Sequence, residues 1–195
     1  MKYLLISILF VGCGEGKVIV KPEPITQEHS FCTYDIDNIC VMEDNRFADI
    51  DPETLSWSLN ITEEYFNLFY PGLNLSSLSE SEGFKIHYRF ANINTKYQGE
   101  YSNLETTAYI YLRTGDGITD RIKCMDKYYI AMHEVLHFIN SRYLEYDITI
   151  DYLHMVPHVF YQWESQTSVE EHREWDQTNI IEGLIYYDIS NMCGY

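Results

Sequence analysis

Residues 128–139 read Tyr-Tyr-Ile-Ala-Met-His-Glu-Val-Leu-His-Phe-Ile, an apolar run that contains the pattern His-Glu-x-x-His. The run is predicted to be helical. Positions four apart share one face of a helix, so His133 and His137 would point the same way. Two neutral imidazoles at that spacing can hold one zinc ion, and Glu134 can reach a water on the metal and accept its proton. The stretch therefore predicts a metal centre for hydrolysis, against the plainer reading of a helix whose histidines bond to neighbouring side chains.

The limits of this helix are predicted from residues with capping chemistry. Asp126 can accept hydrogen bonds from the first backbone N–H groups, which places the start there. Asn140 tolerates the left-handed conformation of a helix stop, which places the end there. The motif would then occupy the last turns of a short helix.

Composition limits the class of protein. A chain of 195 residues suggests one domain, and its 46% apolar content is enough for a core. The formal net charge of −17 argues against nucleic acid as a partner, because little in the chain would neutralise phosphates. Tyrosine is frequent, with 18 residues, and suits strands and half-buried surfaces.

The N-terminus has the pattern of an export signal. A basic start at Lys2 is followed by an apolar core, residues 3–11, which is too short to span a membrane. The core ends in Gly12-Cys13, which resembles the bacterial lipobox and implies cleavage before Cys13 and lipidation of its thiol. The alternative is a plain secretory signal, so the chain is expected to be exported, either membrane-anchored or secreted. The predicted organisation is a signal peptide over 1–12, a tether over 13–25 and a metallopeptidase-like domain over 26–195.

Four cysteines remain after the predicted lipid acceptor, and an even number in an exported protein predicts two disulfides. Three pairings are open. Cys32 with Cys40 is favoured because it closes a short loop, and Cys124 with Cys193 would then tie the motif helix to the C-terminus. A cysteine zinc site is the weaker reading, since no Cys-x-x-Cys spacing occurs.

The remaining chain predicts an α+β domain. Asp51-Pro52 begins a helical region that ends at Pro71-Gly72, and the Ser-rich residues 73–82 are predicted to be a loop. Strands are expected at Phe84–Phe90, with His87 on the polar face, and at Thr107–Arg113, followed by a turn at 115–117. A final helix is predicted over Ser168–Asp188, and its apolar stripe at Ile180, Ile181, Leu184 and Ile185 is assigned to the core.

The order of these elements resembles the metzincin clan of zinc endopeptidases, especially its matrixin-like branch. The resemblance covers roughly residues 84–188 and implies a small mixed sheet, an active-site helix and a C-terminal packing helix. Metzincins have a glycine and a third zinc histidine after the motif, and Asn140 and Tyr143 stand at those positions here. Met155-Val156-Pro157 resembles the Met-turn, whose methionine lies beneath the zinc.

The third zinc ligand is left open among three residues: Tyr143, His154 and His158. A further route is the gluzincin pattern, in which a glutamate of the last helix completes the site. Glu170, Glu171 and Glu174 are the candidates for that role, although such glutamates usually form a solvated helix face.

These observations lead to two hypotheses of different classes. The first is a zinc-dependent metalloendopeptidase in which His133 and His137 bind Zn²⁺ and Glu134 is the general base. Its peptide or protein substrate would pair along the Thr107–Arg113 strand as an edge of the sheet. The second is a non-catalytic surface lipoprotein on a metzincin-like scaffold that binds a partner. A structural zinc site without hydrolysis is a third possibility.

Overall fold

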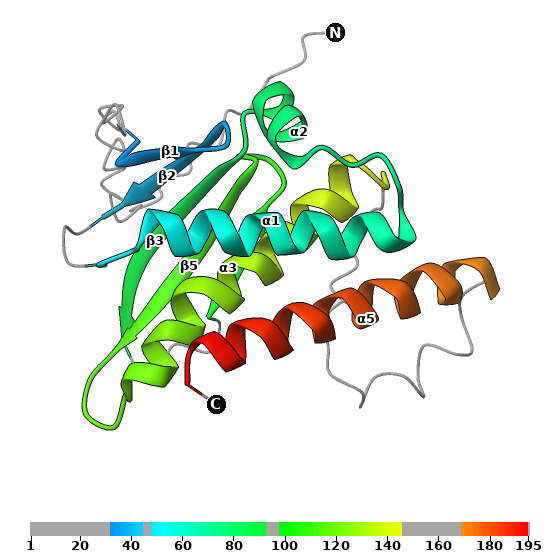
Figure 1. Ribbon diagram of the computed structural model, residues 1–195. Coiled ribbons are helices and arrows are strands. Elements are labelled where there is room, and N and C mark those ends of the chain that lie inside the picture. The colour runs from blue at the N-terminus through cyan, green and yellow to red at the C-terminus, as the bar shows by residue number, and fades with distance from the viewer. Residues whose placement is uncertain (1–31, 45–47, 93–97, 146–168, 195) are drawn as a thin grey trace, which may run out of the picture. The chain divides into compact units, whose positions relative to one another are not determined.

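The computed structural model describes residues 32–44, 48–92, 98–145 and 169–194, and not the side chains of 91–92 and 169–176. The described part is a mixed α+β structure, as predicted, with one five-stranded sheet and four helices (Figure 1). Within it, no helix has the length and apolar character needed to cross a membrane. The predicted signal peptide, tether, lipidated Cys13 and residues 154–158 lie outside the described residues.

The sheet has the order β1-β2-β3-β5-β4. Its strands are β1 (Tyr34–Ile36), β2 (Ile39–Glu43), β3 (Lys85–Asn92), β4 (Gly99–Ser102) and β5 (Thr107–Thr114). The pairs β2–β3 and β3–β5 are parallel, while β1 and β4 are antiparallel strands at the two ends.

The two strands predicted from alternation are confirmed as β3 and β5. Ile86 and Tyr88 on β3, with Ala108 and Ile110 on β5, are buried on the face that the helices cover. The prediction that residues 107–113 form an edge is wrong, because β5 lies between β3 and β4.

Helices α1 (Pro52–Phe69), α3 (Asp120–Arg142) and α5 (Val169–Met192) lie on the same side of the sheet (Figure 1). Helix α3 packs on β4 and β5, and it also contacts α1 and α5. Phe84, immediately before β3, stacks on Phe138 of α3, with ring centroids 4.0 Å apart. The motif helix is therefore the central helix of the core.

Helix α1 begins and ends where the sequence predicts. The side chain of Asp51 accepts hydrogen bonds from the backbone N–H groups of Glu53 and Thr54, and Pro52 occupies the first turn. The helix stops at Tyr70, immediately before Pro71-Gly72.

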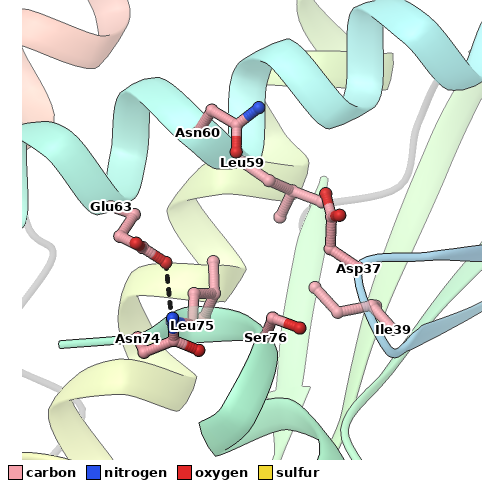
Figure 2. Close-up of a pocket in the computed structure, with 8 residues that line it drawn as sticks. All are labelled: Asp37, Ile39, Leu59, Asn60, Glu63, Asn74, Leu75 and Ser76. Atoms are coloured by element: carbon pink, nitrogen blue, oxygen red, sulfur yellow. Dashed lines mark hydrogen bonds between the residues drawn. The ribbon is translucent and has the colours of Figure 1, made fainter.

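A short helix, α2 (Leu75–Glu82), replaces the predicted loop. Asn74 caps its first turn by accepting from the N–H of Ser77, and Gly83 ends it in the left-handed conformation. Figure 2 shows Glu63 of α1 accepting a hydrogen bond from the N–H of Leu75 at 2.6 Å, which fixes α2 to α1. Serine has a weak helix propensity, so these caps and contacts decide the conformation.

Both predicted limits of α3 are wrong. The helix begins at Asp120, capped by the hydroxyl of Thr119, and continues past Asn140 to Arg142. Asp126 lies inside the helix with 1% of its surface exposed, and its carboxylate accepts two hydrogen bonds from the guanidinium of Arg113 on β5. Asn140 is fully buried within the helix. The motif still occupies the last turns, as predicted.

Two disulfides join Cys32 to Cys40 and Cys124 to Cys193, and both favoured pairings are confirmed. The second bond links the first turns of α3 to the end of α5. Disulfides form and persist in oxidising compartments, so the two bonds indicate an exported protein.

The predicted C-terminal packing helix is confirmed and extends to Met192. Its apolar stripe is only partly core: Ile181 and Ile185 are buried, whereas Ile180 is 51% exposed. Buried Ile189 extends the packing face by one turn, because residues 181, 185 and 189 recur at helical spacing.

Candidate metal centre

The motif side chains converge on one point beside α3. His133, Glu134 and His137 each offer a ligand atom, and these atoms lie within 4.8 Å of one another. The two imidazole rings are 5.2 Å apart between centroids, and each histidine side chain is 19% exposed. The helix therefore presents a group that could hold a metal ion and that solvent can reach.

The carboxylate of Glu182 on α5 forms a hydrogen bond with the first histidine of the motif. The Nδ1 of His133 lies 2.7 Å from Oε1 of Glu182, and the hydroxyl of Tyr129 donates to the same oxygen at 2.8 Å. Because Glu182 engages Nδ1, a metal would be bound through Nε2 of His133. A carboxylate on the far nitrogen of a metal-binding histidine fixes its tautomer and ring orientation.

The side chain of Glu134 lies on the side of α3 that packs against the end strand β4. It is 4% exposed, and its Oε2 is buried without a hydrogen-bond partner in the described part of the chain. That oxygen lies 3.8 Å from Nε2 of His137. A buried carboxylate oxygen without a partner is costly, and a cation with its water would satisfy it.

Gly99 of β4 makes this position for Glu134 possible. A Cβ atom at residue 99 would lie 2.3 Å from Oε1 of Glu134 and 2.8 Å from Cγ2 of Ile130. The backbone of β4 therefore approaches the motif helix more closely than any side chain at residue 99 permits.

The environment shifts the pKa values of the site residues in different directions. Burial raises the pKa of Glu134 to about 7 and lowers the pKa of His137 to about 3. Burial alone would lower the pKa of His133, but the hydrogen bond and charge of Glu182 outweigh it and raise that pKa. For Glu182, burial opposes ionisation, yet its bonds to His133 and Tyr129 lower its pKa. Near neutral pH, Glu182 is ionised and His137 is neutral, as a metal ligand must be.

The candidates for a third ligand have different outcomes. Tyr143 follows α3 directly; its hydroxyl lies 3.4 Å from the carbonyl oxygen of Pro71, and its ring packs edge-on against Phe66. These contacts place its side chain against the end of α1. His154, His158 and the Met-turn candidate Met155 lie outside the described residues, as do the side chains of Glu170, Glu171 and Glu174. His87 is on the predicted polar face of β3, half-buried and paired with Asp44.

Sequence reasoning missed Glu182 and Gly99. The signal for Glu182 was present: it is a carboxylate between Ile181 and Ile185, inside the stripe predicted to pack on the core. Glu170, Glu171 and Glu174, which the gluzincin pattern suggests, lie two to three turns earlier on the same helix. Gly99 has no comparable signal, because its role depends on the approach of β4 to α3.

No family model matches the chain, and comparison with curated proteins and with solved structures finds no significant match. The assignment of the candidate site therefore rests on the geometry of its residues alone.

Proposed function

We propose that the protein is a zinc-dependent metallopeptidase, with His133 and His137 as zinc ligands and Glu134 as general base. The observation that carries the proposal is the convergence of the three motif side chains, with Glu182 fixing the orientation of His133. A carboxylate on the far ring nitrogen is typical of histidines that bind a metal, because it fixes their tautomer and ring orientation.

The donor set suits zinc. Imidazole nitrogens such as those of His133 and His137 are ordinary zinc ligands. Oε2 of Glu134, a buried acceptor without a protein partner among the described residues, would accept a hydrogen bond from a water on that metal. A zinc ion bound by His133 and His137 would supply Lewis acidity, which would acidify a water and polarise a peptide carbonyl. His154 and His158 stay as predicted third ligands, since a catalytic zinc usually takes three from the protein.

Glu134 has the properties of a base for this reaction. In the metal-free site burial raises the pKa of Glu134 to about 7, and a bound cation would lower that pKa, so the carboxylate would be ionised and able to accept a proton at neutral pH. Its Oε1 lies beside the backbone of Gly99, and its Oε2 lies 3.8 Å from Nε2 of His137. The role proposed for it is to accept the proton of water and to donate it to the leaving amine.

The substrate is proposed to be an extended peptide that pairs with β4. This strand is the end of the sheet beside the motif helix, and it is bonded to β5 only along its inner side within the described residues. Addition of a strand would place the peptide backbone next to Glu134. This replaces the Thr107–Arg113 strand, whose two sides are both occupied. Export is supported by the disulfides, and anchoring through Cys13 stays a prediction.

The test measures zinc and hydrolysis together. Purified protein should contain stoichiometric zinc by mass spectrometry, which His137→Ala should lose and the matched control His87→Ala should keep. Glu134→Gln should retain zinc and fold but lose at least about 100-fold in cleavage of a quenched-fluorescence peptide library, the contribution expected of a general base.

Three results would contradict the proposal. Unchanged hydrolysis in Glu134→Gln would remove the assigned base. Stoichiometric zinc without hydrolysis in the wild type would point to a structural site. A folded wild type without zinc would favour the non-catalytic binding protein.

A further inference from the structure

A cavity of about 400 Å³ lies at the other end of α3 from the metal centre. It is lined by the carboxyl ends of β3 and β5, the following loop and the first turns of α3. In sheets with parallel strands, ligands bind in crevices at the carboxyl ends of the strands. The volume is in the range of small-molecule sites.

Positive charge is concentrated at this cavity. The described part of the chain contains seven lysine and arginine side chains, and Arg113, Lys123 and Lys127 all line the cavity. In a chain with a formal net charge of −17, such a grouping is against the general composition. Asp49 and Asp126 also line the cavity, so three cations and two carboxylates give its lining a formal charge of +1.

The two lysines supply the charge that a ligand would meet. Arg113 is balanced by the buried carboxylate of Asp126, to which it donates two hydrogen bonds. Lys127 donates to the carbonyl oxygen of Asp49 at 2.7 Å, and its charge also opposes the rise in the pKa of Glu43 that burial causes. Lys123, with a 53% exposed side chain, pairs with the fully exposed Asp120 at 3.2 Å. An ammonium has three N–H donors, so each lysine keeps donors for a ligand.

Part of the cavity wall is apolar. Leu112 and Ile118 line it together with Phe90, which is 40% exposed although it follows the buried positions of β3. A ligand that satisfied both the lysines and these apolar residues would carry an oxyanion and an apolar group.

We propose that this cavity binds a small organic oxyanion, a phosphate ester or a carboxylate with an apolar group, through Lys123 and Lys127. The inference does not depend on the metallopeptidase function. Lys127 precedes His133 by six residues, or roughly 9 Å along the helix axis, so both sites can be occupied together.

The test is calorimetric titration of the full chain with phenyl phosphate, phenylacetate and inorganic phosphate at low salt. Phenyl phosphate or phenylacetate should bind more tightly than inorganic phosphate, because only they fill the apolar wall, and the tighter of the two identifies the class of oxyanion. The double variant Lys123→Gln/Lys127→Gln should bind that probe at least about tenfold more weakly. The matched control is Lys85→Gln on β3, outside the cavity, which should bind like the wild type.

The single variant Lys123→Gln separates a binding defect from a folding defect. Its side chain is largely in solvent, so it should keep the wild-type unfolding temperature and still bind the probe more weakly. The proposal is overturned if no probe binds the wild type at millimolar concentration, if inorganic phosphate binds as well as the aromatic probes, or if the folded lysine variants bind unchanged.

Discussion

Two glutamates within the candidate site show how the environment divides one residue type into two roles. Glu182 receives hydrogen bonds from His133 and Tyr129, and these bonds favour its ionised form. Glu134 is more deeply buried, and one of its oxygens has no such donor among the described residues, so burial favours its protonated form. Glu182 is therefore a fixed negative charge beside His133, whereas Glu134 can exchange a proton near neutral pH.

The raised pKa of Glu134 predicts a pH dependence of stability in the metal-free protein. Below about pH 4.5, Glu134 is protonated in both the folded and unfolded states. Between that pH and about 7, the unfolded state loses the proton while the folded state keeps it, so the free energy of unfolding falls as pH rises. Above pH 7 the penalty is constant at about 3 kcal/mol.

Glu134→Gln cannot ionise and should lack this loss. Chemical denaturation in the presence of a chelator should show the variant gaining stability relative to the wild type from pH 4.5 to 7.5. The charge of Glu134 also raises the pKa of His133, so the difference between the two proteins reports the loss of Glu134 together with its coupling to that histidine. A difference that does not change with pH would mean that Glu134 ionises normally in the folded protein.

At the scale of elements, the spacing between β4 and α3 decides whether the motif glutamate can occupy its position. Gly99→Ala would place a methyl group 2.3 Å from Oε1 of Glu134, so either the carboxylate or the strand must move. We expect the free energy of unfolding to fall by about 1–3 kcal/mol. Peptide hydrolysis should fall as well, because the carboxylate of Glu134 is displaced.

Gly183→Ala on α5 is the matched control for this substitution. Nothing lies within 4 Å of a Cβ at residue 183, and alanine favours a helix over glycine by up to about 1 kcal/mol. The same change should therefore destabilise at residue 99 and stabilise at residue 183. Thermal unfolding and peptide cleavage check both, and an unchanged activity in Gly99→Ala would show that Glu134 tolerates displacement.

Elements with a strong internal pattern were predictable from the sequence, and those made by contacts were not. The alternation in β3 and β5 and the Asp51-Pro52 start of α1 are local signals, and each was confirmed. Helix α2 was missed because Asn74, Gly83 and Glu63 overcome a serine-rich sequence. Asp126 suggested a helix start, but its carboxylate accepts a hydrogen bond from Arg113, which lies on a strand that precedes α3 in the chain. Sequence alone does not show which partner a carboxylate will find.

At the scale of the whole molecule, the site depends on two helices that are far apart in the sequence. The motif on α3 contributes three residues of the site. The fourth, Glu182, lies on α5, 49 positions after its partner His133. The Cys124–Cys193 bond ties α3 to α5 and so maintains this long-range contact.

The two disulfides should contribute unequally to stability. The Cys124–Cys193 bond spans 69 positions and the Cys32–Cys40 bond spans 8. Closing a longer loop removes more entropy from the unfolded chain. Replacing Cys124 and Cys193 by alanine should therefore lower the free energy of unfolding by about 4 kcal/mol, and replacing Cys32 and Cys40 should lower it by about 2.5 kcal/mol. Calorimetry of both double variants measures the order. Equal losses would show that chain entropy does not control the difference.

The same bond determines what a single cut in the backbone would do. Any one peptide bond between Cys124 and Cys193 can be broken without separating the pieces, because the sulfur bridge still joins them. Such a nicked molecule would run as two fragments on a gel only after reduction. His133 and Glu182 would stay on one covalent assembly even when they no longer share one polypeptide.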